Sequence, residues 1–209
     1  MVYQPADFDS RAAQWDHLPR RVALANAVAT AIIETVPLSP AMKVLDYGCG
    51  TGLVTIQVAP LVGTLYGYDS SNGMLEQFAQ KLADEGLKNV VLRMIDLDAP
   101  LELPTGLDLV ISSMTTHHVP DVATLLNTCA ASLNSGGVLA IADLESEDGS
   151  FHDDATGIAH FGFAVEEMEG YFNQAGLTDV KTVRVMTMVK EREGHAYEYY
   201  INLTTGQLP

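Results

Sequence analysis

Residues 45–54 read LDYGCGTGLV, which places an acid, Asp46, just before three alternating glycines. A turn without Cβ atoms bends sharply and lets a ligand approach the main chain closely. A phosphate-binding P-loop would need Lys and then Ser or Thr after Gly52, but Leu53 follows. The dinucleotide fingerprint G-x-G-x-x-G also fails, because its third glycine would fall at Leu53. The pattern that remains is an acid followed by G-x-G-x-G, at Gly48, Gly50 and Gly52.

The acid before the turn indicates the charge of the ligand. A carboxylate at Asp46 would repel a pyrophosphate and attract a ligand that carries an ammonium and a sulfonium. About twenty residues further on, Asp69 ends a second apolar run, where a carboxylate can accept hydrogen bonds from both hydroxyls of a ribose. Asp96 ends a third such run. An acid at a strand end is often only a helix N-cap, but three acids in this order favour a nucleoside-containing cofactor.

Strands and helices alternate along the chain and bring these acids to one edge. Apolar periodicity predicts helices at 20–36, 51–60, 74–82, 121–133 and 165–175. Short apolar runs predict seven strands at 42–48, 65–69, 89–96, 107–114, 138–143, 180–189 and 195–203. The KEREG turn between the last two is too short for a crossover helix, so they form a hairpin. We therefore expect an α/β fold with a mostly parallel sheet and ligands beyond the carboxyl ends of its strands.

With these motifs the sequence resembles the class I S-adenosylmethionine-dependent methyltransferases. LDYGCGTG matches the first motif of that family, DSSNGML (69–75) its usual continuation, and LDLVISSMTTHHVPD (107–121) its fourth-strand motif. The resemblance is good over residues 43–143. It implies a Rossmann-like, doubly wound sheet of seven strands with a C-terminal antiparallel hairpin. It also implies S-adenosyl-L-methionine as the cofactor.

The resemblance further implies roles for single residues. Asp69 would bind the ribose, and Met74 would lie against the adenine. The Asp96 carboxylate would take the adenine amino group, with Leu97 beside the ring, and Ser113 would run beside the methionine portion. The expected cofactor-binding set is Asp46, Gly48, Gly50, Gly52, Asp69, Ser70, Met74, Asp96, Leu97 and Ser113.

The acceptor is harder to read, because methyl transfer from a sulfonium needs mainly alignment and a dry site. The fourth strand ends in SSMTTHH, unlike the Asn/Asp-Pro-Pro-aromatic motif of enzymes that methylate adenine amines. Cytosine C5 enzymes use a Cys that follows a Pro, whereas Cys129 lies within a predicted helix. The net charge of −16 also argues against a nucleic-acid partner. We therefore expect a small-molecule acceptor.

Two groups near the fourth and fifth strands have alternative interpretations. His117 is either a general base or, with His118, a pair that hydrogen-bonds the loop backbone, and the second is the commoner use of this pattern. Residues 145–163 hold acids and histidines that suit a divalent metal. Their spacing matches no known ligand set, so we expect no metal and a wall of the acceptor site with Phe161 and Phe163. Residues 1–18 form the other expected wall. In it Trp15, Phe8 and Tyr3 either exclude water or fasten the segment to the first helix.

Length and composition bound the remaining expectations. The 209 residues, 47% of them hydrophobic, predict one domain, with a cap segment and helix at 1–40, a cofactor-binding half at 41–143 and an acceptor-side part at 144–209. No apolar run reaches the ~18 residues of a membrane span. The lack of a signal peptide and of a cysteine framework predicts a cytoplasmic location. We also expect a monomer or a homodimer. The alternatives are a protein side-chain methyltransferase that needs a partner subunit, and a module that binds S-adenosylmethionine without turnover.

Overall fold

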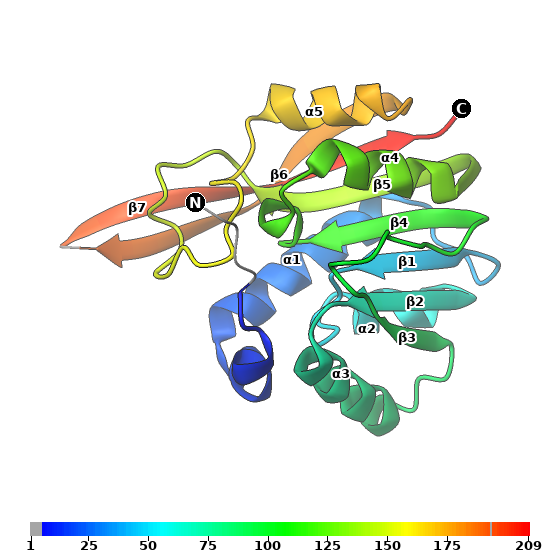
Figure 1. Ribbon diagram of the computed structural model, residues 1–209, viewed down its shortest axis with the longest axis horizontal. Coiled ribbons are helices and arrows are strands. Elements are labelled where there is room, and N and C mark those ends of the chain that lie inside the picture. The colour runs from blue at the N-terminus through cyan, green and yellow to red at the C-terminus, as the bar shows by residue number, and fades with distance from the viewer. Residues whose placement is uncertain (1–5, 193) are drawn as a thin grey trace.

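Seven strands form one twisted sheet in the computed structural model, which describes residues 6–192 and 194–209 (Figure 1). Their order across the sheet is β3-β2-β1-β4-β5-β7-β6. All neighbours pair in parallel except β7, which is antiparallel to both β5 and β6. The predicted fold class is therefore confirmed. The strands are β1 (Lys43–Tyr47), β2 (Thr64–Asp69), β3 (Val90–Met94), β4 (Leu107–Ser113), β5 (Leu133–Leu144), β6 (Thr178–Arg192) and β7 (His195–Gln207).

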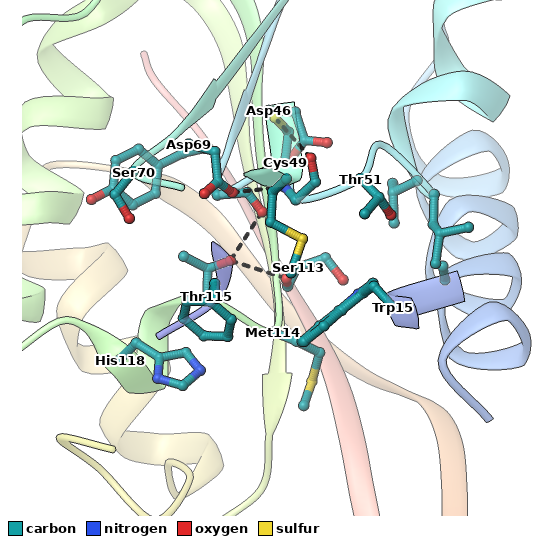
Figure 2. A pocket seen from close by; sticks show the side chains of 18 of the residues that line it. Trp15, Asp46, Cys49, Thr51, Asp69, Ser70, Ser113, Met114, Thr115 and His118 are labelled. Carbon is teal, nitrogen blue, oxygen red and sulfur yellow. Dashed lines mark hydrogen bonds between the residues drawn. The ribbon is translucent and has the colours of Figure 1, made fainter. Parts of the chain in front are cut away.

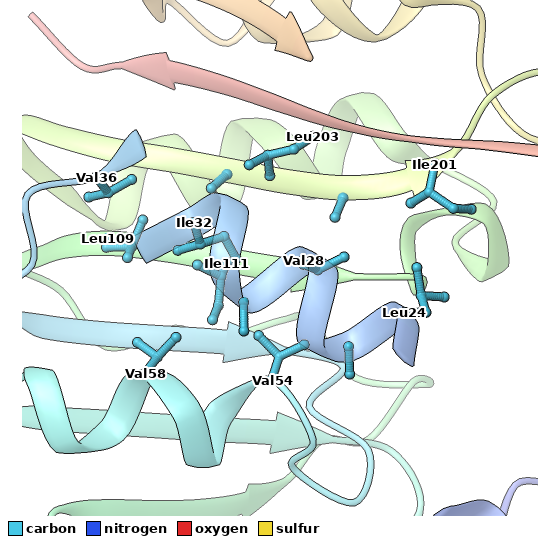
Figure 3. Packing of buried hydrophobic residues seen from close by; sticks show 14 of the residues in the cluster. Leu24, Val28, Ile32, Val36, Val54, Val58, Leu109, Ile111, Ile201 and Leu203 are labelled. Atoms are coloured by element: carbon cyan, nitrogen blue, oxygen red, sulfur yellow. The ribbon is translucent and has the colours of Figure 1, made fainter. Parts of the chain in front are cut away.

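Helices cover both faces of this sheet. They are α1 (Pro19–Thr35), α2 (Thr55–Val58), α3 (Asn72–Glu85), α4 (Val122–Ser132) and α5 (Val165–Gln174), with 3-10 turns η1 (Asp9–His17), η2 (Ala59–Leu61) and η3 (Thr116–His118). The α1 stripe of Leu24, Val28 and Ile32 packs with α2, β4 and β7 side chains in one core (Figure 3). On the other face α4 and α5 pack with β4 and β5 in a second core. This burial holds the strand ends in fixed register.

Helix α3 follows the second strand and its ends are well defined. The Ser71 hydroxyl accepts a hydrogen bond from the Met74 N–H at 3.1 Å, which caps the first turn. Gly86 ends the helix in the left-handed conformation at φ 69°. The apolar stripe that includes Phe78 packs against Cys49 of the glycine turn. Helix α3 thus packs directly against the glycine turn.

Three predicted elements differ in detail from the structure. The helix expected at 51–60 is shorter and splits into α2 and η2, because Pro60 lies at its C-terminal end. Strand β5 begins at Leu133, not at residue 138, so the NSGG segment lies in a strand, with a register irregularity beside it. The connection from β3 to β4, residues 95–106, contains no helix, so the strict alternation of strand and helix fails there.

The strand order reverses at the centre of the sheet, because β2 and β3 follow β1 to one side and β4 and β5 continue on the other. Strand β1 lies between β2 and β4, and their carboxyl ends meet at one edge. Parallel sheets bind ligands at such a switch point. Within the described ranges, no helix is long and apolar enough to cross a membrane.

Candidate functional site

The glycine turn after β1 needs glycine at each of its three positions. Gly48, Gly50 and Gly52 have φ of 73°, 54° and 78°, a region that other residues rarely adopt. A Cβ on Gly48 would lie 2.3 Å from the Thr115 side chain, and one on Gly52 would lie 2.2 Å from the Phe78 ring. A Cβ on Gly50 would meet nothing within 4 Å. The outer glycines are therefore required by packing, and the middle one faces open space.

That space belongs to a cavity of about 210 Å³, here called the glycine-turn cavity (Figure 2). Asp46 and Asp69 lie along one side, with Trp15, Met114 and His118 along the other. The predicted cofactor residues that line it are Asp46, Gly48, Gly50, Asp69, Ser70, Met74, Leu97 and Ser113.

Two predicted cofactor residues lie outside this lining. Gly52 packs on the ring of Phe78. Asp96 is exposed, and its Oδ1 accepts a hydrogen bond from the Asp98 N–H at 2.9 Å. Its neighbours Ile95 and Leu97 line the cavity in its place. A cofactor role for Asp96 therefore stays a prediction.

Asp69 joins the glycine turn to the start of α3. Its Oδ2 accepts the Gly50 N–H at 2.7 Å, and its Oδ1 accepts the Ser71 N–H at 2.9 Å. Burial raises the pKa of Asp69, although these backbone donors oppose the rise. A carboxylate offers about four lone-pair sites. Each oxygen therefore retains capacity for a further donor, such as a ribose hydroxyl.

Asp46 is the most deeply buried acid of the cavity, at 2% exposure. It accepts a hydrogen bond from the Thr55 hydroxyl. Burial raises the pKa of Asp46 to about 7; the Thr55 bond lowers it, and the charge of Asp69 raises it. Near neutral pH the carboxyl is thus balanced between its two forms. A cation in the cavity favours the ionised form.

The N-terminal segment is fastened across the cavity by two acids of η1. The Asp9 carboxylate accepts hydrogen bonds from the Ser71 hydroxyl and from a backbone N–H of α3. Asp16 accepts the Thr51 hydroxyl at 2.6 Å and the Lys81 ammonium at 2.6 Å. These contacts hold the segment against both the glycine turn and α3.

Aromatic side chains of the same segment form part of the cavity wall. Trp15 and Phe8 line it, with ring centroids 5.8 Å apart. The Arg21 guanidinium lies 3.6 Å from the centroid of the Trp15 ring, which fastens Trp15 to α1. The contact with the first helix confirms one alternative for Trp15, and exclusion of water stays a prediction. Tyr3, the third aromatic of the expected wall, lies outside the described residues.

A second cavity of about 430 Å³, here called the histidine cavity, adjoins the first. His117, His118 and His152 contribute to its lining. Several residues line both cavities, among them Phe8, Trp15, Arg21, Leu24, Met114 and His118. The two cavities therefore share one wall.

Met114 lies in this shared wall at the end of β4. Its φ of 54° is left-handed, which is strained for a residue with an unbranched side chain. Its N–H donates to the Ala142 carbonyl at 2.8 Å, so pairing with β5 holds the strained residue in place. Strain of this kind is typical of functional sites.

His117 forms a buried pair with Asp143. Its Nδ1 lies 2.6 Å from Oδ1 of Asp143, and its backbone N–H donates to Oδ2 at 3.1 Å. Burial favours a raised pKa for Asp143, but the charge of His117 and these hydrogen bonds outweigh it and lower the pKa. The carboxylate is therefore ionised, and its Oδ1 accepts a hydrogen bond from Nδ1–H of His117. The ring lines the histidine cavity.

Two neighbouring histidines are held neutral. Burial, together with the charges of nearby histidines, lowers the pKa of both His118 and His152 to about 4. Nδ1 of His118 lies 2.6 Å from the carbonyl oxygen of Gly157. His118 therefore hydrogen-bonds the loop backbone, as one interpretation of the pair predicts. The ring of His117 instead pairs with Asp143.

Comparison with known proteins identifies the chain. A family model described as a methyltransferase domain matches residues 38–190. The chain belongs to this methyltransferase family. The resemblance to class I S-adenosylmethionine-dependent methyltransferases is thus confirmed, and the family's cofactor is S-adenosylmethionine.

Relatives and solved structures agree with this membership. An uncharacterised methyltransferase of Schizosaccharomyces pombe is 29% identical over 68% of this chain and 55% of its own length. An aklanonic acid methyltransferase of Streptomyces is 31% identical over 52% of this chain and 51% of its own. The chain thus spans about half the length of these curated relatives. Phosphoethanolamine N-methyltransferase 2 of Haemonchus contortus, solved with S-adenosyl-L-methionine, has a similar fold, with a TM-score of 0.71 and 15% identity over 98% of this chain and 60% of that one.

The glycine-turn cavity of this methyltransferase fits the family's cofactor. Gly50 leaves open space at the turn, where a ligand can approach the main chain. Asp69 retains acceptor capacity toward that space, and Asp46 becomes an anion when a cation arrives. Met74 and Leu97 provide apolar surface for an adenine ring.

The segment 145–163 supplies part of the acceptor-side wall, but through other residues than expected. Phe163 is buried in the core beneath α5, and Phe161 is exposed, so neither lines the glycine-turn cavity or the histidine cavity. Phe151 and His152 line the histidine cavity in their place. No group of three His, Cys, Asp or Glu side chains able to hold a metal occurs among residues 6–192 and 194–209.

Sequence reasoning missed several residues of the methyltransferase site. Asp143 was read only as the end of the fifth strand, although an acid at that edge could have been paired with the preceding His117. Asp9 and Asp16 carried no motif. Lys190 was read as part of a charged turn, and its place in the histidine cavity depends on the hairpin folding back over α1.

Proposed function

We propose that this methyltransferase transfers a methyl group from S-adenosylmethionine in the glycine-turn cavity to a small molecule in the histidine cavity. The observation that carries the proposal is the shared wall. Met114, His118 and Trp15 line both cavities, so ligands on the two sides lie next to each other. Adjacent, aligned reactants are the main requirement of an in-line displacement.

Residues of the glycine turn and of η1 prepare the donor side. S-adenosylmethionine supplies a methyl group already activated on a sulfonium. Asp69 would fix the ribose and Asp46 would balance the positive charge. The segment held by Asp9 and Asp16 would exclude water from the reacting atoms.

His117 would serve as the general base for an acceptor that arrives protonated. A hydroxyl or amine acceptor would give its proton to Nε2 as its new bond to carbon forms and the carbon–sulfur bond breaks. The ionised Asp143 would stabilise the imidazolium that results. A nucleophile that arrives as an anion would need no such transfer.

The size and position of the second cavity support a small acceptor. An open cavity of about 430 Å³ suits a small molecule. One relative is named for its action on aklanonic acid and others for ubiquinone biosynthesis, which supports the same class. A protein substrate rich in Lys or Arg would need an acidic rim, but the histidine cavity carries arginines and a lysine. A non-catalytic module would need no adjoining cavity.

The cellular setting stays a proposal as well. Cys49 and Cys129 are both unpaired and buried, which suits a reducing cytoplasm. A monomer or a homodimer is compatible with the site, because both cavities are lined by residues of one chain.

The test is calorimetric titration of the protein with S-adenosylmethionine and with S-adenosylhomocysteine. We expect micromolar binding of both, followed by label transfer from methyl-labelled S-adenosylmethionine to one member of a panel of small hydroxy, amino and carboxylic acceptors. Folded protein that binds neither ligand would refute the proposal. Binding of both without label transfer to any panel member would favour the non-catalytic module.

A further inference from the structure

Positive charge is concentrated in the histidine cavity. The chain has a net charge of −16 and only 11 Lys and Arg residues. Four of these line this single cavity, namely Arg11, Arg20, Arg21 and Lys190. An acidic protein that gathers its few cations around one cavity creates a local field opposite to that of its surface.

The acids near this cavity are already engaged with arginines. Asp154 pairs with Arg11 at 3.4 Å, and Asp153 pairs with Arg192, which lies outside the lining, at 2.7 Å. These two are the only carboxylates among the described lining residues. Among the described residues, none of the remaining three cations forms an ion pair. Asp16 is near enough to Arg21, and Asp153 and Glu147 to Lys190, to raise the pKa of those cations in part.

The hydrogen bonds and ring contacts of Arg21 and Lys190 are all with neutral groups. Arg21 stacks on the Trp15 ring and donates to the Trp15 carbonyl at 3.3 Å. Lys190 donates to the Phe151 carbonyl, and its ammonium lies 4.4 Å from the centroid of that ring. Arg20 is exposed and makes no hydrogen bond or ion pair within the described part of the chain. Neutral contacts orient a cation without cancelling its charge.

The electrostatics of these cations favour an anionic ligand. Burial lowers the pKa of Arg21, and the charges of Arg20 and Arg11 lower it further. Burial also lowers the pKa of Lys190. An anion placed among these groups would relieve their mutual repulsion.

The rest of the lining suits an apolar body with a polar substituent. Phe8, Trp15 and Phe151 supply aromatic surface. His152 is held neutral, and its Nε2 is buried without a hydrogen-bond partner among the described residues.

We infer that the acceptor is a small anion, a carboxylate or phosphate on an apolar body, whose charge is held by Arg20, Arg21 and Lys190. This inference rests on the proposed function, because it assigns the histidine cavity to the acceptor. It also gives the two ligands opposite charges on the two sides of the shared wall. A cationic donor and an anionic acceptor then attract each other as well as the protein.

The experiment measures anion binding without any cofactor, so that it does not depend on turnover. Calorimetric titrations compare 3-hydroxybenzoate and phenyl phosphate with the neutral 3-hydroxybenzamide, at low salt. The protein is tested as wild type, as the double variant Arg20→Gln/Lys190→Gln, and as the control Lys88→Gln. Lys88 is exposed beyond the end of α3 and outside both cavities.

We expect at least one of the two anions to bind wild type and Lys88→Gln roughly tenfold or more tightly than the amide. In the double variant the ratio of anion affinity to amide affinity falls to near one. Whichever of carboxylate and phosphate shows the larger preference identifies the anionic group. Equal binding of anion and amide, or no charge-dependent binding of any probe, overturns the inference, and so does a preference that survives in the double variant.

Two further measurements keep the outcomes separable. The single variant Arg20→Gln repeats the comparison if the double variant does not unfold cooperatively, because Arg20 is exposed and makes no contact that the fold needs. S-adenosylmethionine is titrated into the same preparations. Retained cofactor binding without anion preference refutes only this inference, whereas anion preference without cofactor binding refutes the proposed function.

Discussion

The glycine-turn cavity and the histidine cavity share a wall but carry opposite charge. The first holds two buried carboxylates, Asp46 and Asp69, with one arginine, Arg21, in the wall that it shares with the second. The second holds three arginines, a lysine and three histidines against two exposed carboxylates, Asp153 and Asp154. The two cavities also differ in origin, since the acids of the first lie in one stretch of 24 residues between positions 46 and 69. The second is assembled from η1, α1, η3, the loop after β5 and the terminal hairpin. The acids of the glycine-turn cavity thus come from one compact motif, whereas the charged groups of the histidine cavity come from segments far apart in the chain.

The largest effect is expected for the substitution His117→Gln, which tests whether the two cavities have separate roles. We expect the rate of methyl transfer to a hydroxyl acceptor to fall roughly 10²- to 10⁴-fold, because the proton acceptor is lost. The affinity for S-adenosylmethionine should stay the same, since His117 lines only the histidine cavity. Steady-state kinetics and calorimetry measure the two quantities. His160→Gln, outside both cavities, is the control. An unchanged rate would mean that the nucleophile arrives without a proton.

The converse test is Asp69→Ala on the donor side. Loss of the charge-assisted contact should weaken S-adenosylmethionine binding by about 1.5–3 kcal/mol and leave the anion preference of the histidine cavity unaltered. Asp96→Ala is the matched comparison, because Asp96 is exposed and outside the lining. If Asp96→Ala weakened S-adenosylmethionine binding as much as Asp69→Ala does, Asp96 would make the adenine contact expected from the sequence. This result would also imply that the loop after β3 moves on binding.

A smaller effect follows from the titration of Asp46. Burial raises its pKa to about 7, and a cationic ligand favours its ionised form. The affinity for S-adenosylmethionine should therefore rise with pH through about 7, by at most roughly 1.4 kcal/mol per unit below that pH. Calorimetry across this range should show proton release on binding. Asp46→Asn should remove the pH dependence, and a slope that persists in this variant would contradict the assignment.

The smallest effect concerns the segment that closes the shared wall. Asp16→Asn removes a partly buried ion pair with Lys81 and weakens the contact with Thr51. We expect the free energy of unfolding to fall by about 0.5–1 kcal/mol in denaturant titrations. Arg93→Gln, which breaks the more exposed pair with Glu102, should change it less. Equal losses would show that the η1 contacts stabilise the fold no more than the exposed pair of Arg93 and Glu102 does.

The difference between the cavities also explains how far the sequence could be read. The alternation of apolar runs with helical patterns predicted the sheet. The order of acid, glycine turn and strand-end acid predicted a set of residues most of which line one cavity, because these residues lie at neighbouring strand ends. The distant contacts had no such pattern. Arg20 and Arg21 look like the polar start of a helix, and only the packing of α1 against the hairpin brings them near Lys190.

Errors in the predicted elements have the same cause. The NSGG segment looks like a helix breaker followed by a turn, yet it continues as β5, where residues 136–138 hydrogen-bond to the C-terminal end of the chain. Asp96 follows a strand just as Asp69 does. However, Asp69 binds two backbone N–H groups, whereas Asp96 turns toward its own loop. Local sequence carries no information about such partners.

Trp15 gives the shared wall a built-in optical reporter. It is the only tryptophan of the chain, it borders both cavities, and the Arg21 guanidinium stacks on its indole ring. The tryptophan emission of the protein therefore comes from this single point. A ligand that enters either cavity changes the surroundings of the indole, and an anion that draws Arg21 away also changes its quenching. Intrinsic fluorescence thus follows the filling of the site without any added label.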